Sequence, residues 1–330
     1  MKFFKLSRTL ISFTASVVLA SVAPIAVAQT AAAGPDIYKI VVPLPAGGGV
    51  DVFVRKLSES MSKHLNKTVI VDNKPGAAGQ LAVQSVASGP ADGSSILYLH
   101  SGILTVQTIT GRMDVQRDFK PIGKVSSTPH VLVVAANSPY ASMADLLKGI
   151  QSAPGKLNYG SGGNGSPTHL MFEQMDEKFP GGLKATHVPF KGSIEGVFAV
   201  VSGSIDFVFA PPGAVVEQMK AGKLRALATT GAVRMAQLPN VPTLAEAGIT
   251  KYQDEPWGGL VVPAATPDAQ VNRLFTALKA AGAEPALLDM INKVGGKMEV
   301  SNSPAVFAAQ IRDELVANKA LVAKLGLKAE

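Results

Sequence analysis

The stretch IYKIVVPLPAGGGVD, residues 37–51, decides the fold of this chain. Its apolar first part predicts a short β-strand. The glycine run that follows opens an amphipathic helix, because apolar residues recur at helical spacing from Val50 to Leu65. A strand that ends in glycines at the start of a helix leaves backbone N–H groups free at the positive end of the helix dipole. The junction therefore predicts an anion site that needs no charged side chain.

Two further Gly- or Pro-rich junctions, residues 158–169 and 188–193, repeat the same change from a strand to a helix. Ser166 is placed to cap the second helix, and Pro167 suits its first position. Strand-to-helix junctions of this kind on distant parts of one chain indicate that an anionic group is held from two sides. The pattern predicts binding of a small anion rather than a reaction.

The rest of the chain alternates strands with helices, which predicts an α/β fold. Short continuous apolar runs are typical of parallel strands that are covered on both faces. The predicted strands are 37–42, 68–72, 95–100, 131–136, 157–159, 186–189, 205–210, 225–229 and 259–262. The predicted helices are 50–66, 78–87, 143–151, 167–179, 194–202, 214–221, 267–281, 285–293 and 304–325.

Two strong strands, 131–136 and 259–262, bracket a central α/β block of ordinary domain size. No low-complexity linker separates this block from the ends of the chain. We therefore expect a hinge that the chain crosses twice at these two strands. One lobe would comprise residues 29–133 and 257–330, and the other residues 134–256. Ligands of open α/β sheets bind at the carboxyl ends of strands, so we expect the ligand in a cleft between the lobes.

The first 28 residues have the layout of a secretory signal peptide. Lys2, Lys5 and Arg8 precede an apolar segment, residues 10–22, and Ala26-Val27-Ala28 is a typical cleavage pattern. The alternative is an uncleaved membrane anchor, but the apolar segment is short for a spanning helix. We expect cleavage after Ala28 and an exported, soluble protein.

Composition excludes several function classes. The chain has no cysteine, which excludes disulfides, thiol catalysis and cysteine-based metal sites. Its formal net charge of +7 falls to +4 without the leader, because the leader holds three basic residues and no acidic one. The remaining basic residues are scattered, so we expect no nucleic-acid partner.

Known motifs argue against nucleotide and catalytic sites. Gly160, Gly162 and Gly165 match the dinucleotide-binding fingerprint, but the next strand does not end in the acidic residue that would hold the ribose. No Gly-Lys-Ser/Thr follows the first glycine run, no Gly-x-Ser-x-Gly motif occurs, and no nucleophile–base pair is visible. His169 and Glu173 could ligate a metal from one helix face, but a local hydrogen bond fits their spacing better. We expect no enzyme activity, no cofactor and no metal.

Two acidic residues leave alternatives open. Asp51 either binds an ammonium group of the ligand or interacts with the dipole of its own helix. Asp206 is either a ligand contact or a structural cap. Phe190, Ile103 and Ala210 suggest a partly apolar wall for the ligand's far end.

A series of motifs in order along the chain resembles the extracytoplasmic solute-binding proteins of tripartite tricarboxylate transporters, the Bug family. The resemblance runs from about Tyr38 to the C-terminus. It is carried by VVP and GGGVD at residues 41–51, VDNKPGAAG at 71–79, PADG at 90–93, RDFKPI at 117–122, PGKLNYGS at 154–161, HVPFKG at 187–192, AGKLRALA at 221–228 and LPNVPT at 238–243. Each motif is weak alone, but their shared order is specific.

The resemblance implies a two-lobed, type II-like periplasmic binding protein fold with two crossovers in the hinge. It implies a monomeric periplasmic protein that binds a small carboxylate (a dicarboxylate, an aromatic acid or an amino acid) and delivers it to permease subunits. Two other functions remain open: a receptor that feeds a membrane sensor kinase, and an exported hydrolase using the same cleft. The expected ligand-binding residues are Pro45, Ala46, Gly47, Gly48, Asp51, Ser101, Gly102, Ser161, Gly162, Asn164, Gly165, Ser166, His169, Phe190 and Ala210.

Overall fold

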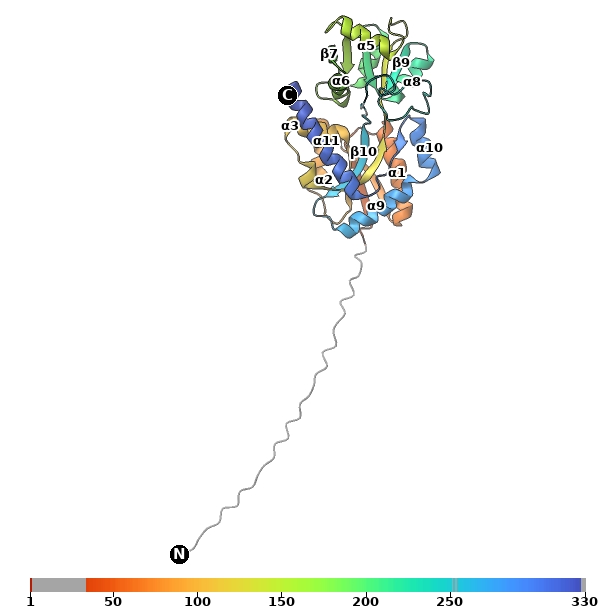
Figure 1. Ribbon diagram of the computed structural model, residues 1–330. Coiled ribbons are helices and arrows are strands. Elements are labelled where there is room, and N and C mark those ends of the chain that lie inside the picture. The colour runs from red at the N-terminus through yellow and green to blue at the C-terminus, as the bar shows by residue number, and fades with distance from the viewer. Residues whose placement is uncertain (2–33, 251, 253, 328–330) are drawn as a thin grey trace. The chain divides into compact units, whose positions relative to one another are not determined.

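The computed structural model describes Met1, residues 34–250, Tyr252 and residues 254–327. The predicted signal peptide and its cleavage site lie outside these residues. Gly34–Glu330 forms one compact unit, which contains two β-sheets with helices on both faces of each (Figure 1). None of the helices in the described part of the chain is long and apolar enough to cross a membrane.

The first sheet has six strands in the order β11-β4-β10-β3-β1-β2. Their bounds are β1 Ile37–Val42, β2 Thr68–Asn73, β3 Ser95–His100, β4 Phe119–Ser127, β10 Trp257–Pro263 and β11 Lys297–Met298. Side chains alternate along β1: Ile40 packs with the helices of one face, and Val41 packs with those of the other. Both faces are therefore buried, which explains the continuous apolar run in the sequence.

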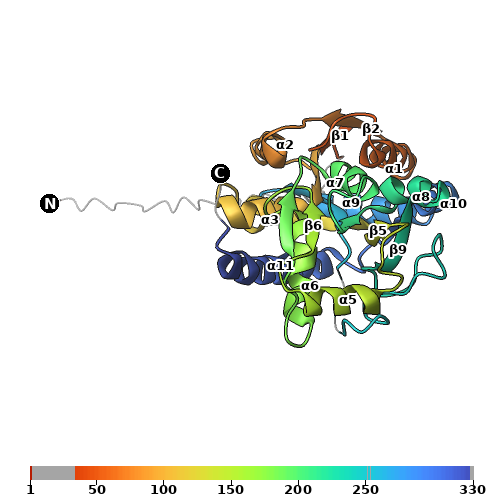
Figure 2. The ribbon, with the colours of Figure 1, turned by 90° about the horizontal axis from the view of Figure 1, so that it is seen from above.

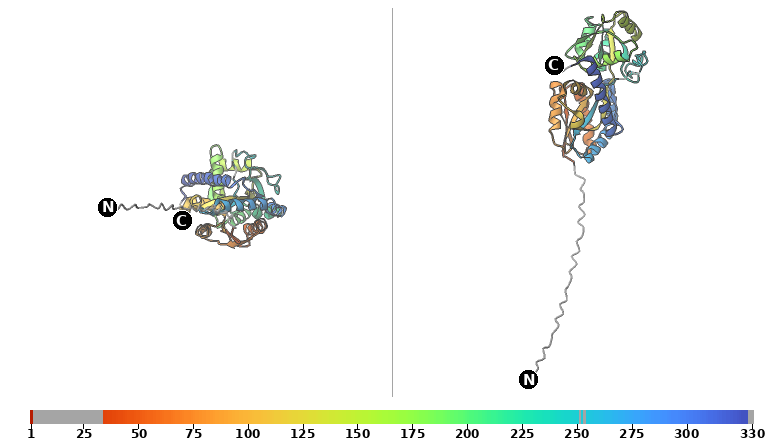
Figure 3. Two further views of the ribbon diagram at one scale, coloured as in Figure 1. Left: turned by 90° about the horizontal axis from the view of Figure 1, so that it is seen from below. Right: turned by 60° about the vertical axis from the view of Figure 1, so that its left-hand side comes forward.

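Two groups of helices cover the first sheet. On one face lie α1 Gly49–Leu65, α9 Asp268–Gly282 and α10 Pro285–Lys293. On the other face lie the 3₁₀ helix η1 Ala77–Gly79, α2 Gln80–Ala87, α3 Ser101–Thr110, α4 Val115–Asp118 and α11 Pro304–Leu325. The long helix α11 packs on β4 and α3, and it also contacts α6 (Pro167–Lys178) beside the second sheet (Figure 3).

The second sheet has five strands in the order β7-β6-β8-β5-β9. Their bounds are β5 Val131–Ala135, β6 Asn158–Ser161, β7 Thr186–Pro189, β8 Phe207–Ala210 and β9 Leu224–Thr229. Helices α5 Met143–Ser152 and α6 cover one face, and helices α7 Ser193–Val201 and α8 Pro212–Lys220 cover the other (Figure 2).

Both sheets are mixed, whereas the apolar runs predicted parallel strands. β1 pairs in parallel with β2 and β3, but β10 runs antiparallel to both β3 and β4. In the second sheet, β5 runs antiparallel to β8 and β9. The reason is topological. The chain enters the second sheet through β5 and returns to the first sheet through β10. Each of these strands begins at the edge where the parallel strands of its sheet end, so it runs in the opposite direction to them.

The chain passes between the two sheets twice, between Ser127 and Val131 and again before Trp257. A hydrogen bond from the Thr128 N–H to the Pro256 carbonyl, 2.8 Å long, joins the two passages. The sequence placed the hinge in the strands themselves, but β5 and β10 are each fully paired inside one sheet. We therefore propose that the two lobes meet at the segments 128–130 and 254–256, which keeps β5 whole.

Several elements were absent from the sequence prediction: α3, α4, β4 and β11. Six of the ten residues of α3 are β-branched, a composition that favours strands over helices. Strand β4 contains Pro121 and Gly123, which normally interrupt strands. In both elements, burial against the rest of the fold outweighs the local preference.

Candidate ligand-binding site

An inner chamber of about 410 Å³ lies where the starts of five helices converge. Helices α1 and α3 belong to the first sheet, and α6, α7 and α8 belong to the second. The two passages of the chain between the sheets close the remaining sides. The lining residues are Leu44, Val50, Tyr98, His100, Ser101, Gly102, Ser126, Thr128, His130, Gly162, Ser166, Pro167, Thr168, Gly192, Ser193, Pro211, Pro256, Trp257 and Gly258.

Four of these helices begin without a side-chain cap. The residues at the N-cap positions are Gly48 for α1, His100 for α3, Gly192 for α7 and Pro211 for α8, and none of their side chains accepts a bond from the first turn. First-turn N–H groups have no partner inside their own helix. Two of them are already paired, because the Glu195 N–H of α7 and the Ala214 N–H of α8 donate to the carbonyls of Gly192 and Pro211, and Pro212 at the start of α8 has no N–H. The other first-turn N–H groups face no competing side-chain cap and are available to an anion in the chamber, which each helix dipole would stabilise by about 0.3–1 kcal/mol.

Other helices contrast with this arrangement. Helices α4, α5 and α11 start elsewhere and are capped by the side chains of Asp114, Ser142 and Ser303. Helices α2, α9 and α10 also lack a side-chain cap. Helices α9 and α10 start away from the chamber, and α2 starts beside a larger chamber that adjoins it. Side-chain caps are thus present at three of the six other described α-helices and at one of the five helix starts around the chamber.

The chamber lining contains no Asp, Glu, Lys or Arg. Its two histidines are neutral at neutral pH, because burial lowers the pKa of His100 and that of His130 to about 4. No side chain of the lining thus supplies a formal positive charge. Any preference for an anion must come from N–H groups, hydroxyl groups and helix dipoles.

The second glycine loop differs from our expectation of free N–H groups. The N–H of Gly162 donates to the Thr168 hydroxyl (2.9 Å), and that of Gly165 donates to Nδ1 of His169 (3.0 Å). The N–H of Gly163 donates to the Ser161 hydroxyl at 3.0 Å. The loop also caps α6, because the Ser166 hydroxyl accepts a bond from the His169 N–H. These side chains hold the loop in shape, and its amide groups are already occupied.

A buried cluster lies behind this loop. Oγ of Ser161 and Nε2 of His187 are 2.6 Å apart, and the rings of His187 and His169 stack with their centroids 3.9 Å apart. Sequence analysis did not detect this serine–histidine pair. Ser161 is fully buried, and its hydroxyl accepts the Gly163 N–H. It lines neither the inner chamber nor the larger chamber of about 860 Å³ that adjoins it. Burial also lowers the pKa of His187. The pair therefore braces the loop and has no access to a substrate in the chambers.

Asp51 makes its contacts inside its own loop. Its Oδ2 accepts bonds from the Gly47 N–H (2.8 Å) and from Nε of Arg55 (3.0 Å), and only 3% of the residue is exposed. The Arg55 guanidinium and the Gly47 N–H lower the pKa of this carboxyl to about 2. Of the two alternatives, this geometry favours a structural role at the start of α1.

An outer chamber of about 860 Å³ continues from the inner one and shares with it Leu44, His100, Gly102, Gly162, Ser166 and Pro167. Its own walls are mainly apolar. They comprise Pro43, Pro45, Pro75, Gly76, Ala78, Gly79, Val106, Ile109, Thr110, Gly163, Asn164, Gly165 and Pro189. Ala77 and Ala78 both have positive φ angles, of 46° and 50°, so this wall contains strained backbone.

The structure places the expected site residues in two groups. Seven line one or both chambers: Pro45, Ser101, Gly102, Gly162, Asn164, Gly165 and Ser166. The other eight line neither: Ala46, Gly47, Gly48, Asp51, Ser161, His169, Phe190 and Ala210. Gly48 is the N-cap of α1, and Ala210 is fully buried in the second sheet. The ligand contacts of all fifteen residues stay a prediction.

Sequence reasoning omitted several lining residues, including His100, Thr128, Gly192 and Ser193. A signal existed for Gly192 and Ser193, because they end the third junction, residues 188–193. Trp257 begins β10, and its ring lies edge-on to Phe307 at 5.0 Å between centroids. No local signal marks His100 or Thr128.

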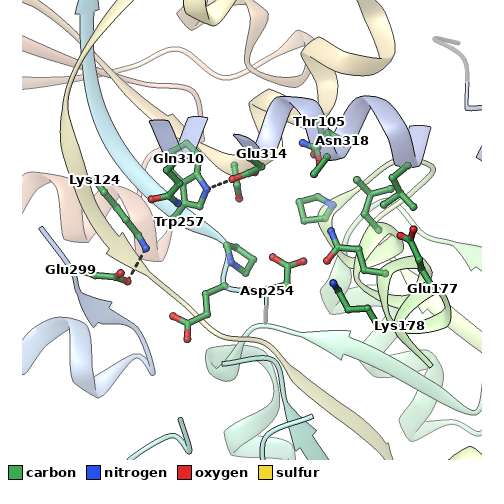
Figure 4. A pocket seen from close by; sticks show the side chains of 18 residues that line it. Thr105, Lys124, Glu177, Lys178, Asp254, Trp257, Glu299, Gln310, Glu314 and Asn318 are labelled. Atoms are coloured by element: carbon green, nitrogen blue, oxygen red, sulfur yellow. Dashed lines mark hydrogen bonds and ion pairs between the residues drawn. The ribbon is translucent and has the colours of Figure 1, made fainter. Parts of the chain in front are cut away.

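A third cavity, of about 440 Å³, lies behind Pro256 and Trp257 and is highly charged (Figure 4). Glu314 accepts a bond from Nε1 of Trp257 at 2.5 Å, and Lys124 pairs with Glu299 at 2.8 Å. Asp254 faces the same space. Burial raises the pKa of Glu314 to about 7 and that of Asp254 to about 6, so both carboxyl groups hold protons more tightly than usual.

Comparisons with known proteins agree with this architecture. The family model described as "Tripartite tricarboxylate transporter family receptor" matches residues 53–327. A curated relative from Cupriavidus necator, the UPF0065 protein in the gbd 5′ region, is 34% identical over 293 residues, covering 88% of this chain and 87% of the relative.

Two solved structures show the same fold. Periplasmic binding protein BugD is 27% identical, with a TM-score of 0.72, over 89% of this chain and 99% of that one. An R. palustris protein with adipate is 28% identical, with a TM-score of 0.74, over 89% of this chain and 99% of that one. The fold is thus that of the two-lobed periplasmic binding proteins, a class of solute receptors. This chain belongs to the tripartite tricarboxylate transporter receptor family.

Proposed function

We propose that this protein binds a small organic carboxylate between its two sheets and delivers it to the membrane subunits of a tripartite tricarboxylate-type transporter. The single observation that carries the proposal is the convergence of four uncapped helix starts on a chamber with no charged side chain. N–H donors and helix dipoles suit a carboxylate, whose oxygens accept several hydrogen bonds. The adipate held by a structural neighbour supports the same ligand class.

The energetics require more than the dipoles. A micromolar affinity corresponds to about 8 kcal/mol, and each helix start supplies about 0.3–1 kcal/mol. Burial of the ligand body and exclusion of water must provide much of the rest. We propose that the lobes close around the ligand, and that the closed monomer is the form that the permease recognises. The protein would bind and release its ligand unchanged, without a catalytic step.

A thermal-shift panel of organic acids and their neutral amides tests the binding step. We expect acids to raise the melting temperature in a concentration-dependent manner, because a ligand that binds only the folded state stabilises it. The matching amides should give much smaller shifts, since they lack the anionic acceptor. Equal shifts from acids and amides would contradict the proposal.

Uptake of a stabilising acid tests the delivery step. A strain in which the gene is deleted should lose uptake of that acid and regain it when the gene is restored. Unchanged uptake together with lost induction of a ligand-responsive gene would indicate a sensing receptor instead.

A further inference from the structure

The charged cavity behind Pro256 and Trp257, of about 440 Å³, is a second space between the two halves of the fold (Figure 4). Residues of α3 and α11, which cover the first sheet, line it together with residues of α6, which covers the second. It shares four lining residues with the inner chamber: Ser101, Pro167, Pro256 and Trp257. Its other residues have no role in the proposed carboxylate site, and they give this cavity a different charge.

More acidic than basic side chains line the cavity. The acidic residues are Glu177, Asp254, Glu255, Glu299 and Glu314, and the basic residues are Lys124 and Lys178. Some of these charges are already balanced. Glu299 pairs with Lys124 at 2.8 Å, and Glu255 pairs with Lys297 at 3.1 Å. Glu177 and Lys178 are both exposed, at the end of α6. Among the described residues, Asp254 and Glu314 therefore have no ion-pair partner.

These two carboxyl groups come from different walls of the cavity. Asp254 lies in the second passage of the chain between the sheets, and Glu314 lies on α11. Glu314 accepts the Trp257 Nε1–H at 2.5 Å, whereas no described residue donates a hydrogen bond to the Asp254 carboxyl. Burial raises the pKa of Asp254 to about 6 and that of Glu314 to about 7. A cation beside them would favour their ionised forms.

An amide on α11 adds a hydrogen-bond donor to the same space. Asn318 follows Glu314 by four residues, so the two side chains lie on the same face of the helix. Asn318 lines the cavity, and only 5% of the residue is exposed. Its Nδ2 has no hydrogen-bond partner, which is unfavourable for a buried donor. An acceptor on a molecule in the cavity would satisfy this donor.

The size and the walls of the cavity favour an organic cation over a metal ion. Within the described part of the chain, no three acidic or histidine side chains are grouped to hold a metal ion. The volume exceeds that of a bare ion. Leu170, Leu321 and Trp257 also line the space and offer apolar contact to carbon atoms.

We propose that this cavity binds a small organic ammonium ion that also carries a hydrogen-bond acceptor, such as an amino alcohol. The ammonium group pairs with Asp254 and Glu314, and the acceptor receives the Nδ2–H of Asn318. This second site is separate from the carboxylate site and adds a ligand of opposite charge to the proposed function.

Calorimetry with ethanolammonium chloride at pH 8 tests the proposal on the mature chain. We expect saturable binding. Ethylammonium, which lacks the hydroxyl acceptor, should bind about threefold or more weakly. Ethylene glycol, which lacks the charge, should not bind. Absence of ethanolammonium binding would overturn the proposal. Equal heats and equal thermal shifts from sodium chloride at the same ionic strength would also overturn it, because they would indicate screening of the acidic side chains.

The pH dependence gives a test that needs no variant. Protons and the ammonium ion compete for the same two carboxyl groups, while the amine itself stays protonated between pH 5 and 8. Affinity for ethanolammonium should therefore rise about tenfold or more from pH 5 to pH 8. Calorimetry in buffers of different ionisation enthalpy at pH 6 should detect proton release on binding. Binding without proton release and with a flat pH profile would contradict pairing with Asp254 and Glu314.

Variants locate the site. Asp254→Asn and Glu314→Gln each remove one negative charge with little change in shape, and each should weaken ethanolammonium binding about tenfold or more at pH 8. Asp313→Asn is the matched control, because Asp313 is exposed on the same helix and lies outside the cavity lining. It should keep the wild-type affinity. Melting curves establish that each variant is folded. Full affinity in either folded cavity variant would overturn the assigned pairing.

Discussion

Individual residues around the chambers differ sharply in what they contribute. Asp51 and His169 have the chemistry of functional groups, but the structure uses both to hold glycine loops in shape. Gly192 has no side chain, so as the N-cap of α7 it provides no side-chain acceptor for that helix's first amide groups. The N–H donors for a ligand thus lie at helix starts that have no capping side chain. The polar side chains nearby hold the loops that carry these donors in shape.

Glu314 carries a prediction about pH. Burial raises its pKa from the usual 4.5 to about 7, so the folded protein keeps a proton that the unfolded chain releases between these values. Stability should therefore fall as pH rises through this range, by up to about 3 kcal/mol. Glu314→Gln, which keeps an acceptor for Trp257, should flatten the dependence of melting temperature on pH between about 5 and 8.

The neighbouring Asp313 provides the control for this measurement. It lies on the same helix, it is exposed, and it pairs with Arg312 at the surface. Asp313→Asn should keep the slope of the wild-type profile. If Glu314→Gln also kept that slope, burial of Glu314 would not be the cause.

At the scale of elements, the helix starts explain the site better than the glycine motifs do. The second glycine loop, the stronger motif, satisfies its own amide groups and caps α6. The α7 start has the weaker motif and no cap. Because an N-cap side chain and a bound anion compete for the same N–H groups, adding a cap should weaken binding.

Gly192→Ser tests this competition. The backbone at Gly192 has φ −173° and ψ 160°, close to the φ −159° and ψ 165° of Ser303, which caps α11. A serine should therefore cap α7, leave stability unchanged or raise it by a few tenths of a kcal/mol, and weaken carboxylate binding about tenfold. Calorimetry and a melting curve would measure the two effects separately.

Pro267→Ser is the matched control, because it adds a cap to α9, which starts away from both chambers. Its affinity for carboxylates should equal that of the wild type. A Gly192→Ser variant with full affinity would show that the α7 amide groups do not contact the ligand.

In the whole unit formed by residues 34–330, the chamber exists only because the two sheets present their helix starts to each other. The first sheet contributes α1 and α3, and the second contributes α6, α7 and α8. The passages at 128–130 and 254–256 are hydrogen-bonded to each other and form one wall. A ligand held in this way must contact both halves of the fold.

Hydrogen exchange tests that requirement. A bound carboxylate should slow exchange simultaneously at residues 49–51 in the first half and at residues 193–195 in the second, where the first-turn amides of α1 and α7 lie. The passages at 128–130 should also be protected as the lobes close. Protection confined to one half would contradict binding between the two sheets.

The sequence by itself predicted much of the fold. The predicted α/β class agrees with the structure. The predicted bounds of α10, α11 and β7 match the observed ones residue for residue. These elements carry strong local signals: proline at the first helical position, apolar periodicity, and short apolar runs between turns. The glycine junctions also predicted the starts of α1, α6 and α7, and the binding of an anion there stays a prediction.

Only the tertiary structure decided which helix starts share one chamber and which of them have free donors. Whether a Gly162 amide is free depends on the rotamer of Thr168. Helix α3 forms although six of its residues are β-branched, and of these Ile103 and Thr105 are buried. The antiparallel direction of β5 and β10 follows from the two passages of the chain. Such properties arise from contacts between residues far apart in sequence, which local propensity does not encode.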